Sequence, residues 1–274
     1  MRIASLQPSV SIILERLGRL DLLVACTRYC VEAVPELTRQ SIAIVHDSWS
    51  TSAEELLAVR PDLVIASVPY RNESLAAILK AGFPVLALAP HSLADIYQDI
   101  CLIGAVAGAA EQVKPRAEEV IAAMQASIDE VRRRAAGLHK PLVYCEEWGK
   151  PLIHSQLWVR ELVEAAGGVF VGEPGAVTTP EAVAAADPEV ILAAWCGAGD
   201  GVPLEKLAAR PGWKQIRAVR QGQVYCIPDE LLNTPAPTLV DGLSAIASAL
   251  HPDVFGTNGG IRALKGNRTV VDCV

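Results

Sequence analysis

The sequence has no long apolar run and few aromatic residues, although half of it is apolar. No stretch approaches the roughly 18 consecutive apolar residues that indicate a membrane-spanning helix. A basic stretch with interleaved aromatic residues is also missing, and the net charge is −7 with a pI near 5.3. Because contacts to nucleic-acid phosphates need clustered Lys and Arg, this balance argues against a nucleic-acid-binding protein.

A signal peptide and a disulfide pattern are not evident either. Met1-Arg2 leads directly into Ile3–Leu6, which is typical of a first strand rather than of an apolar leader. We therefore expect a cytoplasmic protein, or a periplasmic one whose leader has been removed. The seven cysteines are an odd number and include no CxxC pair, which favours reduced, buried thiols over a disulfide framework.

The common enzyme motifs are absent as well. The sequence contains no GxSxG, no Walker loop, and no GxGxxG between a strand and a helix. Glu146-Glu147 and Asp229-Glu230 are acidic pairs, but adjacent side chains in a strand or loop point apart, so we interpret them as solvated loop charge. We expect a protein that is not an enzyme and needs no catalytic cofactor.

A repeated helix–proline–strand pattern is the main feature that is present. Residues 52–67 read SAEELLAVRPDLVIAS, and residues 179–194 read TPEAVAAADPEVILAA. Without a gap, Pro61 aligns with Pro188, and the apolar run Leu63–Ala66 aligns with Val190–Ala193. A short apolar run of this kind is typical of a strand that is covered on both faces. The pattern predicts two related α/β lobes that arose by duplication.

Strand and helix patterns alternate along the rest of the chain, as in α/β folds. We predict two Rossmann-like lobes joined by one long connecting helix, which would be about 37 Å long, with the ligand cleft between the lobes. Thr27–Gln40 and Glu146–Ser155 are predicted to be loops. The predicted bounds are 1–111 for the first lobe, 112–138 for the connecting helix, 139–255 for the second lobe and 256–274 for a frayed tail.

The ends of the predicted strands carry the candidate binding residues, because α/β folds bind ligands at the carboxyl ends of parallel strands. Three of the five tryptophans, Trp49, Trp148 and Trp195, fall in these segments. Flat aromatic side chains could hold a large, flat, mostly apolar ligand, or they could cap the cores of the lobes. The other residues at these ends include Pro8, Ser9, Tyr29, Cys30, Tyr70, Arg71, His91, Cys196 and the segment Glu230–Asn233.

These segments resemble a known family. RIASLQPSVSIILERLG at the start, SAEELLAVRPDLVIAS, the long middle helix, LVEAAGG and PEVILAAW are similar to the substrate-binding proteins of ABC importers with a helical backbone (class III). The cobalamin-binding branch, the relatives of the periplasmic vitamin B12 receptor, is the most similar. The resemblance covers residues 2–250 and implies that a corrinoid lies flat between two lobes.

The resemblance also implies which residues act. The positions that match the ligand-lining loops of the family, with Tyr29 added from the strand ends, are Pro8, Ser9, Tyr29, Ser48, Trp49, Ser50, Ser67, Tyr70, Arg71, Trp148, Trp195, Cys196, Glu230, Leu231 and Asn233. Glu73 and Glu205 match the two glutamates that dock onto an ABC permease. Each also suits a helix N-terminus for electrostatic reasons alone. Where the periplasmic receptor has a large aromatic residue, this chain has Ser67. We expect a monomer.

Other chemistries stay open at this stage. His46, His91 and His154 could contribute to a metal site, as in the metal receptors of the superfamily, but no pair has close spacing. His46, Cys30 and Cys196 are weak candidates for coordinating the cobalt of a corrinoid. A siderophore or haem receptor of the same fold is an alternative, although few Arg and Lys residues are available for an anionic ligand. A cytoplasmic enzyme or chaperone that handles corrinoids is another.

Overall fold

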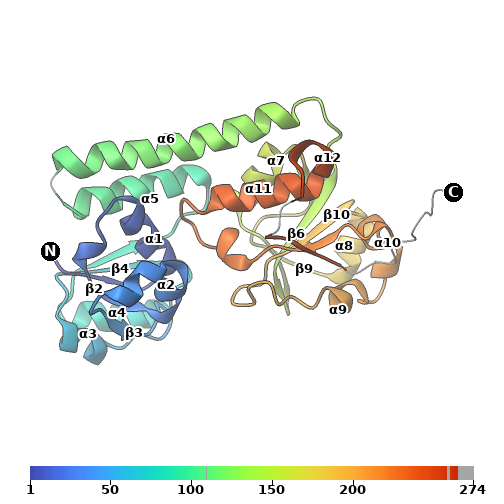
Figure 1. The fold of residues 1–274 in the computed structure, drawn as a ribbon. Helices are drawn as coiled ribbons and strands as arrows, with labels where there is room; N and C mark the ends of the chain where they lie inside the picture. Colours follow the sequence, from blue (N-terminus) through green and yellow to red (C-terminus); the bar gives the residue numbers. More distant parts are fainter. Residues whose placement is uncertain (109, 258–259, 265–274) are drawn as a thin grey trace. The chain divides into compact units, whose positions relative to one another are not determined.

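The computed structural model describes residues 1–108, 110–257 and 260–264. The chain divides into two compact units (Figure 1). Unit 1 contains residues 1–126 and 234–239, and unit 2 contains residues 127–233 and the chain from 240 on. The long helix α6 (Ala110–Ala135) holds residues of both units. The fold is therefore the α/β fold with a connecting helix that the sequence predicts.

Unit 1 is built on one parallel sheet of five strands in the order β3-β2-β1-β4-β5. The order reverses direction after β1, which makes this a doubly wound sheet. All five strands therefore end at the same edge, which we call the carboxyl edge of unit 1. The strands are β1 (Ile3–Ser5), β2 (Leu23–Thr27), β3 (Ala43–Val45), β4 (Leu63–Ser67) and β5 (Val85–Leu88).

Helices cover this sheet because alternate strand residues point to opposite faces. Ala4 and Ala66 face one apolar cluster, to which helices α3 and α4 contribute Leu56, Leu75 and Ile78. The helices of the unit are α1 (Pro8–Arg16), α2 (Arg28–Ala33), α3 (Ala53–Val59), α4 (Asn72–Lys80) and α5 (Leu93–Val106), with 3₁₀ turns at Leu20–Leu22 and Pro35–Arg39.

The predicted loop over Thr27–Gln40 is wrong. The segment holds α2 and the second 3₁₀ turn instead. Thr27 caps α2, since its hydroxyl accepts a hydrogen bond from the backbone N–H of Cys30 at 3.1 Å. Pro35 starts the 3₁₀ turn, where its fixed φ is already helical. Both signals are visible in the sequence, but each of these elements is too short to show a helical apolar period.

Unit 2 contains a mixed sheet in the order β12-β11-β10-β6-β7-β9, with β8 paired to β6. Strand β10 is parallel to β6 and β11, whereas β7 and β12 run antiparallel to their neighbours. The strands are β6 (Leu142–Gly149), β7 (Leu152–His154), β8 (Val169–Phe170), β9 (Val177–Thr178), β10 (Val190–Ala193), β11 (Val224–Cys226) and β12 (Arg262–Ala263).

The remaining helices follow the strands of unit 2 in sequence, although α11 begins at the end of the segment assigned to unit 1. They are α7 (Leu157–Ala165), α8 (Pro180–Ala186), α9 (Leu204–Ala208), α10 (Arg217–Gln221), α11 (Leu239–Leu250) and α12 (Pro252–Phe255), with 3₁₀ turns at Trp213–Gln215 and Asp229–Leu231.

Two further predictions are wrong in this unit. The predicted loop over Glu146–Ser155 is a hairpin of β6 and β7 that turns at Lys150-Pro151. The predicted frayed tail contains β12, which pairs with β11, and residues 265–274 lie outside the described part of the chain. An antiparallel partner strand needs only a few residues in register, so these short additions leave little signal in the sequence.

The duplicated pattern has the same local structure in both units. Helix α8 occupies the positions that the gapless alignment pairs with α3, and Ser52 and Thr179 stand at the two N-caps. Both helices end on a residue in the left-handed conformation, Arg60 with φ 48° and Asp187 with φ 45°. Each of these residues precedes a proline, which disfavours right-handed helical geometry there. The shared geometry supports the predicted duplication.

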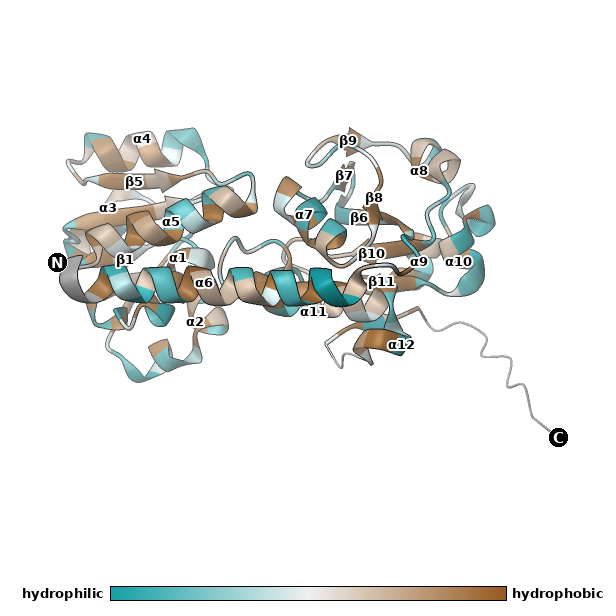
Figure 2. Cartoon of the chain, turned by 90° about the horizontal axis from the view of Figure 1, so that it is seen from above, coloured by the Kyte–Doolittle hydropathy of each residue, from teal (hydrophilic) through white to brown (hydrophobic). Residues whose placement is uncertain are grey.

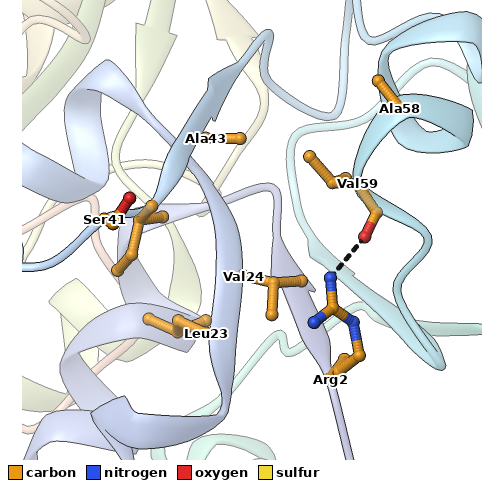
Figure 3. A pocket seen from close by; sticks show the side chains of 8 residues that line it. Arg2, Leu23, Val24, Ser41, Ala43, Ala58 and Val59 are labelled. Atoms are coloured by element: carbon orange, nitrogen blue, oxygen red, sulfur yellow. Dashed lines mark hydrogen bonds between the residues drawn. The ribbon is translucent and has the colours of Figure 1, made fainter.

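An arginine from elsewhere in the unit stabilises each of these helix ends. The guanidinium of Arg2 donates to the carbonyl of Val59 at 2.7 Å, and that of Arg217 donates to the carbonyl of Asp187 at 2.8 Å. Figure 3 shows the first of these bonds. Carbonyls in the last turn of a helix have no partner within the helix, so a cationic donor both satisfies them and suits the helix dipole.

Helix α6 is amphipathic. Val113, Ala117, Met124, Ile128 and Ala135 are buried and recur at spacings of four or seven residues, while most residues between them are exposed. Figure 2 shows the resulting mixture of hydrophilic and hydrophobic residues along α6. The helix begins two residues before the predicted start, and its last residue lies three before the predicted end at Leu138.

A buried acid in α5 gives unit 1 a pH-dependent stability. Asp99 is 8 % exposed, and burial, together with the charge of Asp95, raises the pKa of its carboxyl to about 6. In the unfolded chain an aspartate titrates near 3.9, so the folded state holds this proton more tightly. The contribution of Asp99 to stability is therefore fully present below about pH 4 and is lost as the pH rises to about 6.

Asp99→Asn should remove this loss. We expect the variant to be more stable than the wild type at pH 7.5, by at most about 3 kcal/mol, and equally stable near pH 4. Urea denaturation at the two pH values measures both differences. A gain that is the same at pH 4 and pH 7.5 would show that the ionisation of Asp99 is not its cause.

Candidate functional site

Hydrogen bonds join three loops at the carboxyl edge of unit 1. The backbone N–H and the hydroxyl of Ser48 both donate to the carbonyl of Leu6 at 3.2 Å. The backbone N–H of Arg71 donates to the carbonyl of Ser48 at 3.3 Å, and the amide of Gln7 donates to the carbonyl of Pro69 at 3.0 Å. The loops that follow β1, β3 and β4 therefore form one connected platform.

Trp49 stands on this platform with its ring open to solvent. Its side chain is 53 % exposed. Its backbone is fixed on both sides, since its N–H donates to the carboxylate of Asp47 at 3.1 Å and its carbonyl accepts from the hydroxyl of Ser74 at 2.9 Å. An exposed indole on a fixed backbone is a preorganised apolar surface, which is what a flat ligand requires.

A cavity of about 360 Å³ lies at the carboxyl ends of β2 and β3. Thr27 and Val45, the last residues of these strands, belong to its lining. It therefore opens at the edge where α/β sheets bind ligands. Its lining consists of Thr27, Arg28, Tyr29, Ile44, Val45, His46, Asp47 and Ser50.

A larger hollow of about 440 Å³ lies at the opposite edge of the same sheet. Figure 3 shows it between Leu23 and Ala43, the first residues of β2 and β3, and the end of α3. The guanidinium of Arg2, the cation among its lining residues, is already bonded to the carbonyls of Val59 and Arg60. Because it lies at the amino ends of the strands, we do not assign it to the candidate site.

In unit 2 the central polar group is Glu146, a carboxylate with no exposed surface. Arg210 donates to both of its oxygens, at 2.5 and 2.8 Å. The indole N–H of Trp195 and the hydroxyl of Tyr144 each donate to it at 2.8 Å. The interpretation of Glu146 as solvated loop charge is wrong, because the residue lies within β6 and is buried with its partners.

Trp148 and Trp195, the two tryptophans of unit 2 that the sequence predicts at the ligand site, have different environments. Trp195 is partly buried against the core of the unit, and its ring lies so close to Gly149 that a side chain there would clash at 2.6 Å. Trp148 is 43 % exposed on β6, with its indole N–H bonded to the carbonyl of Lys150 at 2.8 Å. The ring of Trp148 is therefore accessible to a ligand. One face of the Trp195 ring instead packs against the core of the unit.

The loops after β10 and β11 are bonded to each other. The carboxylate of Asp229 accepts from the backbone N–H groups of Gly197 and Gly199, each at 2.7 Å. The amide of Asn233 donates to the carbonyl of Ala194 at 2.7 Å. Asp229 therefore acts as an acceptor for a glycine-rich turn, and the interpretation of its charge as freely solvated is wrong.

Cys196 lies in this turn as a free thiol, 3.7 Å from Glu147. Partial desolvation of the sulfur, together with the charges of Glu147 and Asp229, raises the pKa of this thiol to about 12, although the residue as a whole is exposed. Burial also raises the pKa of the Glu147 carboxyl. Coordination of cobalt by Cys196 would require this thiol to lose its proton on binding the metal, and it stays a prediction.

Several predicted site residues have little surface to offer a ligand. The side chains of Ser9, Ser48 and Ser67 are buried, and Cys30 is fully buried with its thiol bonded to Thr27. Pro8, Tyr70, Leu231 and Asn233 are half-buried. The predicted residues with substantial exposure are Tyr29, Trp49, Ser50, Arg71, Trp148, Cys196 and Glu230.

The histidines do not assemble a metal site. In the part of the chain that the structure describes, no group of three or more His, Cys, Asp or Glu side chains could hold a metal ion. Nδ1 of His46 is bonded to Glu55 at 2.9 Å, and His154 is buried in β7.

Glu73 and Glu205 are exposed in the first turns of α4 and α9, and docking through them stays a prediction.

Sequence reasoning missed Arg210 and Tyr144 as members of the Glu146 cluster. Arg210 is 64 residues from Glu146 in the chain and follows a short helix. Nothing in the sequence around Arg210 indicates that it forms an ion pair with Glu146. Tyr144 lies two residues before Glu146 on the same strand, so the period of two places both side chains on one face. The sequence could therefore have indicated the contact between Tyr144 and Glu146 if the predicted strand had continued beyond Cys145, as β6 does.

The fold is that of a class of two-lobed substrate-binding proteins. The model of the periplasmic binding protein family matches residues 3–231, and the chain belongs to this family. Substrate-binding proteins of ABC uptake systems carry this fold. Over the described residues, no helix is both long and apolar enough to cross a membrane.

Individual relatives differ in the ligand that their names give. The chain is 26% identical to the ABC transporter substrate-binding lipoprotein YvrC of Bacillus subtilis, over 93% of this chain and 81% of that protein. It is 25% identical to the vitamin B12-binding protein of Vibrio cholerae, over 91% and 88%. The structure of the heme-binding protein RhuT of Roseiflexus sp. RS-1 superposes with a TM-score of 0.77 and 26% identity, over 93% and 98%.

Proposed function

We propose that this chain binds a corrinoid, cobalamin or a close relative, as the substrate-binding component of an ABC uptake system. The observation that carries the proposal is the exposed ring of Trp49, which is fixed at the carboxyl edge of unit 1 by its backbone bonds. A corrin ring is flat and mostly apolar on its faces. An indole on a fixed backbone offers a flat apolar surface to it, and little conformational entropy is lost on binding.

Unit 2 supports the same ligand class. Trp148 presents a second open indole on β6, which could hold the flat face of a corrin. The relationship to a vitamin B12-binding protein agrees with this assignment. The family consists of binding proteins, so we propose no reaction. We propose an extracytoplasmic location, by analogy with the lipoprotein relative.

Docking onto a permease through Glu73 and Glu205 belongs to the same proposal. Both side chains are exposed, and Glu73 has only a loose ion pair to Arg71 at 3.7 Å. An ion pair between exposed groups contributes little, so Glu73 can exchange this partner for an arginine of another protein. An uptake assay with both glutamates changed to alanine tests this part.

Titration with cyanocobalamin tests the ligand. We expect binding with a Kd below about 10 µM, which corresponds to roughly 7 kcal/mol. The absorption spectrum of the bound corrinoid measures occupancy and also reports any exchange of the axial cobalt ligand. We expect the spectrum to keep the ligand set of free cyanocobalamin, because Cys30 is buried and Nδ1 of His46 is bonded to Glu55. No binding at this concentration would contradict the proposal.

A haem or other iron chelate is the second candidate ligand. It is favoured by the relationship to RhuT and by Arg28 and Tyr29 at the carboxyl edge, since haem carries carboxylates that an arginine can bind. The scarcity of further cations in the exposed loops weighs against it. Hemin in the same titration separates the two candidates.

A further inference from the structure

The cavity at the ends of β2 and β3 is too small for an entire corrin and has a mixed lining. Its volume of about 360 Å³ is near the lower end of the range for small-ligand pockets. Tyr29 and Ile44 are 38 and 58 % exposed and form apolar surface, and Arg28 adds a cation. This combination suits a side arm that carries an aromatic ring next to a negative charge.

The cation in the lining has capacity for a further partner. One guanidinium nitrogen of Arg28 donates to the Tyr29 hydroxyl at 2.7 Å, and the guanidinium carbon lies 4.6 Å from the centre of the Tyr29 ring. A guanidinium has five N–H donors. Among the described residues, the bond to the Tyr29 hydroxyl is the side-chain hydrogen bond that Arg28 forms. The stacked ring holds the guanidinium at the cavity while its remaining donors can reach an anion.

Nearby acids do not occupy those donors. Asp47 and Glu32 are the carboxylates whose charges act on Arg28. One oxygen of Asp47 already accepts from the backbone N–H of Trp49, from the N–H of Ser50 and from the Ser50 hydroxyl, at 2.8 to 3.1 Å. That oxygen of Asp47 is therefore committed to shaping its own loop. Among the described residues, neither Asp47 nor Glu32 forms an ion pair or hydrogen bond with the guanidinium of Arg28. Nδ1 of His46 is likewise committed to Glu55.

We propose that this cavity binds the anionic side arm of the ligand, which in a complete corrinoid is the phosphodiester of its nucleotide loop. Arg28 contacts the phosphodiester oxygens, and the apolar surface of Tyr29 and Ile44 contacts the attached base. The inference rests on the proposed function and makes it more specific. A chain with this site prefers cobalamin to cobinamide, which lacks the nucleotide loop and its phosphate.

The test compares cyanocobalamin with dicyanocobinamide on three proteins. The wild type should bind cyanocobalamin about ten-fold more tightly than dicyanocobinamide, the size of one charge-assisted hydrogen bond. Arg28→Ala should remove this preference by weakening only cyanocobalamin. Arg39→Ala is the matched control, because Arg39 is an exposed arginine near the amino end of β3 and its loss should leave the preference intact. Circular dichroism confirms that each variant is folded.

The outcomes separate the inference from the proposed function. Equal weakening of both corrinoids in Arg28→Ala, or no change in either, overturns the side-arm site while the corrinoid function stands. Failure of the wild type to bind either corrinoid overturns both. Tight binding of hemin that is weakened by Arg28→Ala and not by Arg39→Ala would keep the anion site, assign it to carboxylates, and overturn the corrinoid function.

Discussion

Arg210→Ala is expected to lower the free energy of unfolding of unit 2 by about 3–5 kcal/mol. The substitution leaves the carboxylate of Glu146 buried without its cation, since that side chain has no exposed surface. The neutral donors from Trp195 and Tyr144 remain but cannot balance the charge. The guanidinium also lies 4.6 Å from the ring centre of the buried Trp213, so packing is lost as well.

Urea denaturation followed by tryptophan fluorescence measures this change in the transition that unfolds unit 2. Arg160→Ala is the control, because Arg160 pairs with Glu164 at 2.8 Å while both side chains are close to half exposed. Its loss should cost no more than about 0.5 kcal/mol. Arg210→Lys should fall between the two, since an ammonium keeps the charge but not the two-pronged contact. Equal stabilities of Arg210→Ala and Arg160→Ala would contradict this role for the pair.

Trp49→Ala is expected to weaken cyanocobalamin binding about 30-fold, or roughly 2 kcal/mol, as for a central aromatic contact. Trp49→Phe keeps a flat apolar side chain and should lose only a fraction of this. Both variants should keep the wild-type stability within about 0.5 kcal/mol, because the side chain is 53 % exposed and the loop is held by backbone bonds.

Leu79→Ala controls for the loss of exposed apolar surface in general. Leu79 is 56 % exposed in the last turn of α4, which returns towards the amino edge of the sheet. Its loss should leave the Kd for cyanocobalamin unchanged. Isothermal titration calorimetry measures all three variants. If Trp49→Ala binds cyanocobalamin as tightly as Leu79→Ala does, the platform is not part of the ligand site.

The sequence predicted the parts of the fold that depend on local signals. The gapless alignment of residues 52–67 with 179–194 placed α3, α8 and the two following strands, because caps, prolines and short apolar runs are all read within a few residues. The connecting helix was predicted at 112–138, within two or three residues of each end of α6. The α/β class followed from the alternation of these elements.

The rest depended on contacts between distant residues. The β6–β7 hairpin was missed because Glu146 is polar in sequence, and only its pairing with Arg210 explains how it can be buried in a strand. Ser48 and Ser67 looked like ligand contacts because serine is polar, yet both are buried, and the Ser48 hydroxyl is bonded to the backbone of Leu6. All three candidate tryptophans looked alike in the sequence. The structure shows that Trp49 and Trp148 are exposed, whereas Trp195 is partly buried against the core of unit 2.

A competition between cyanocobalamin and hemin on the same preparation tests the central claim most directly. Both ligands are flat and metal-centred, so their relative affinity measures whether the exposed indole surfaces outweigh cation contacts. The account predicts that cyanocobalamin binds below about 10 µM and at least about ten-fold more tightly than hemin. Tight hemin binding, together with cyanocobalamin binding weaker than about 10 µM, would contradict it.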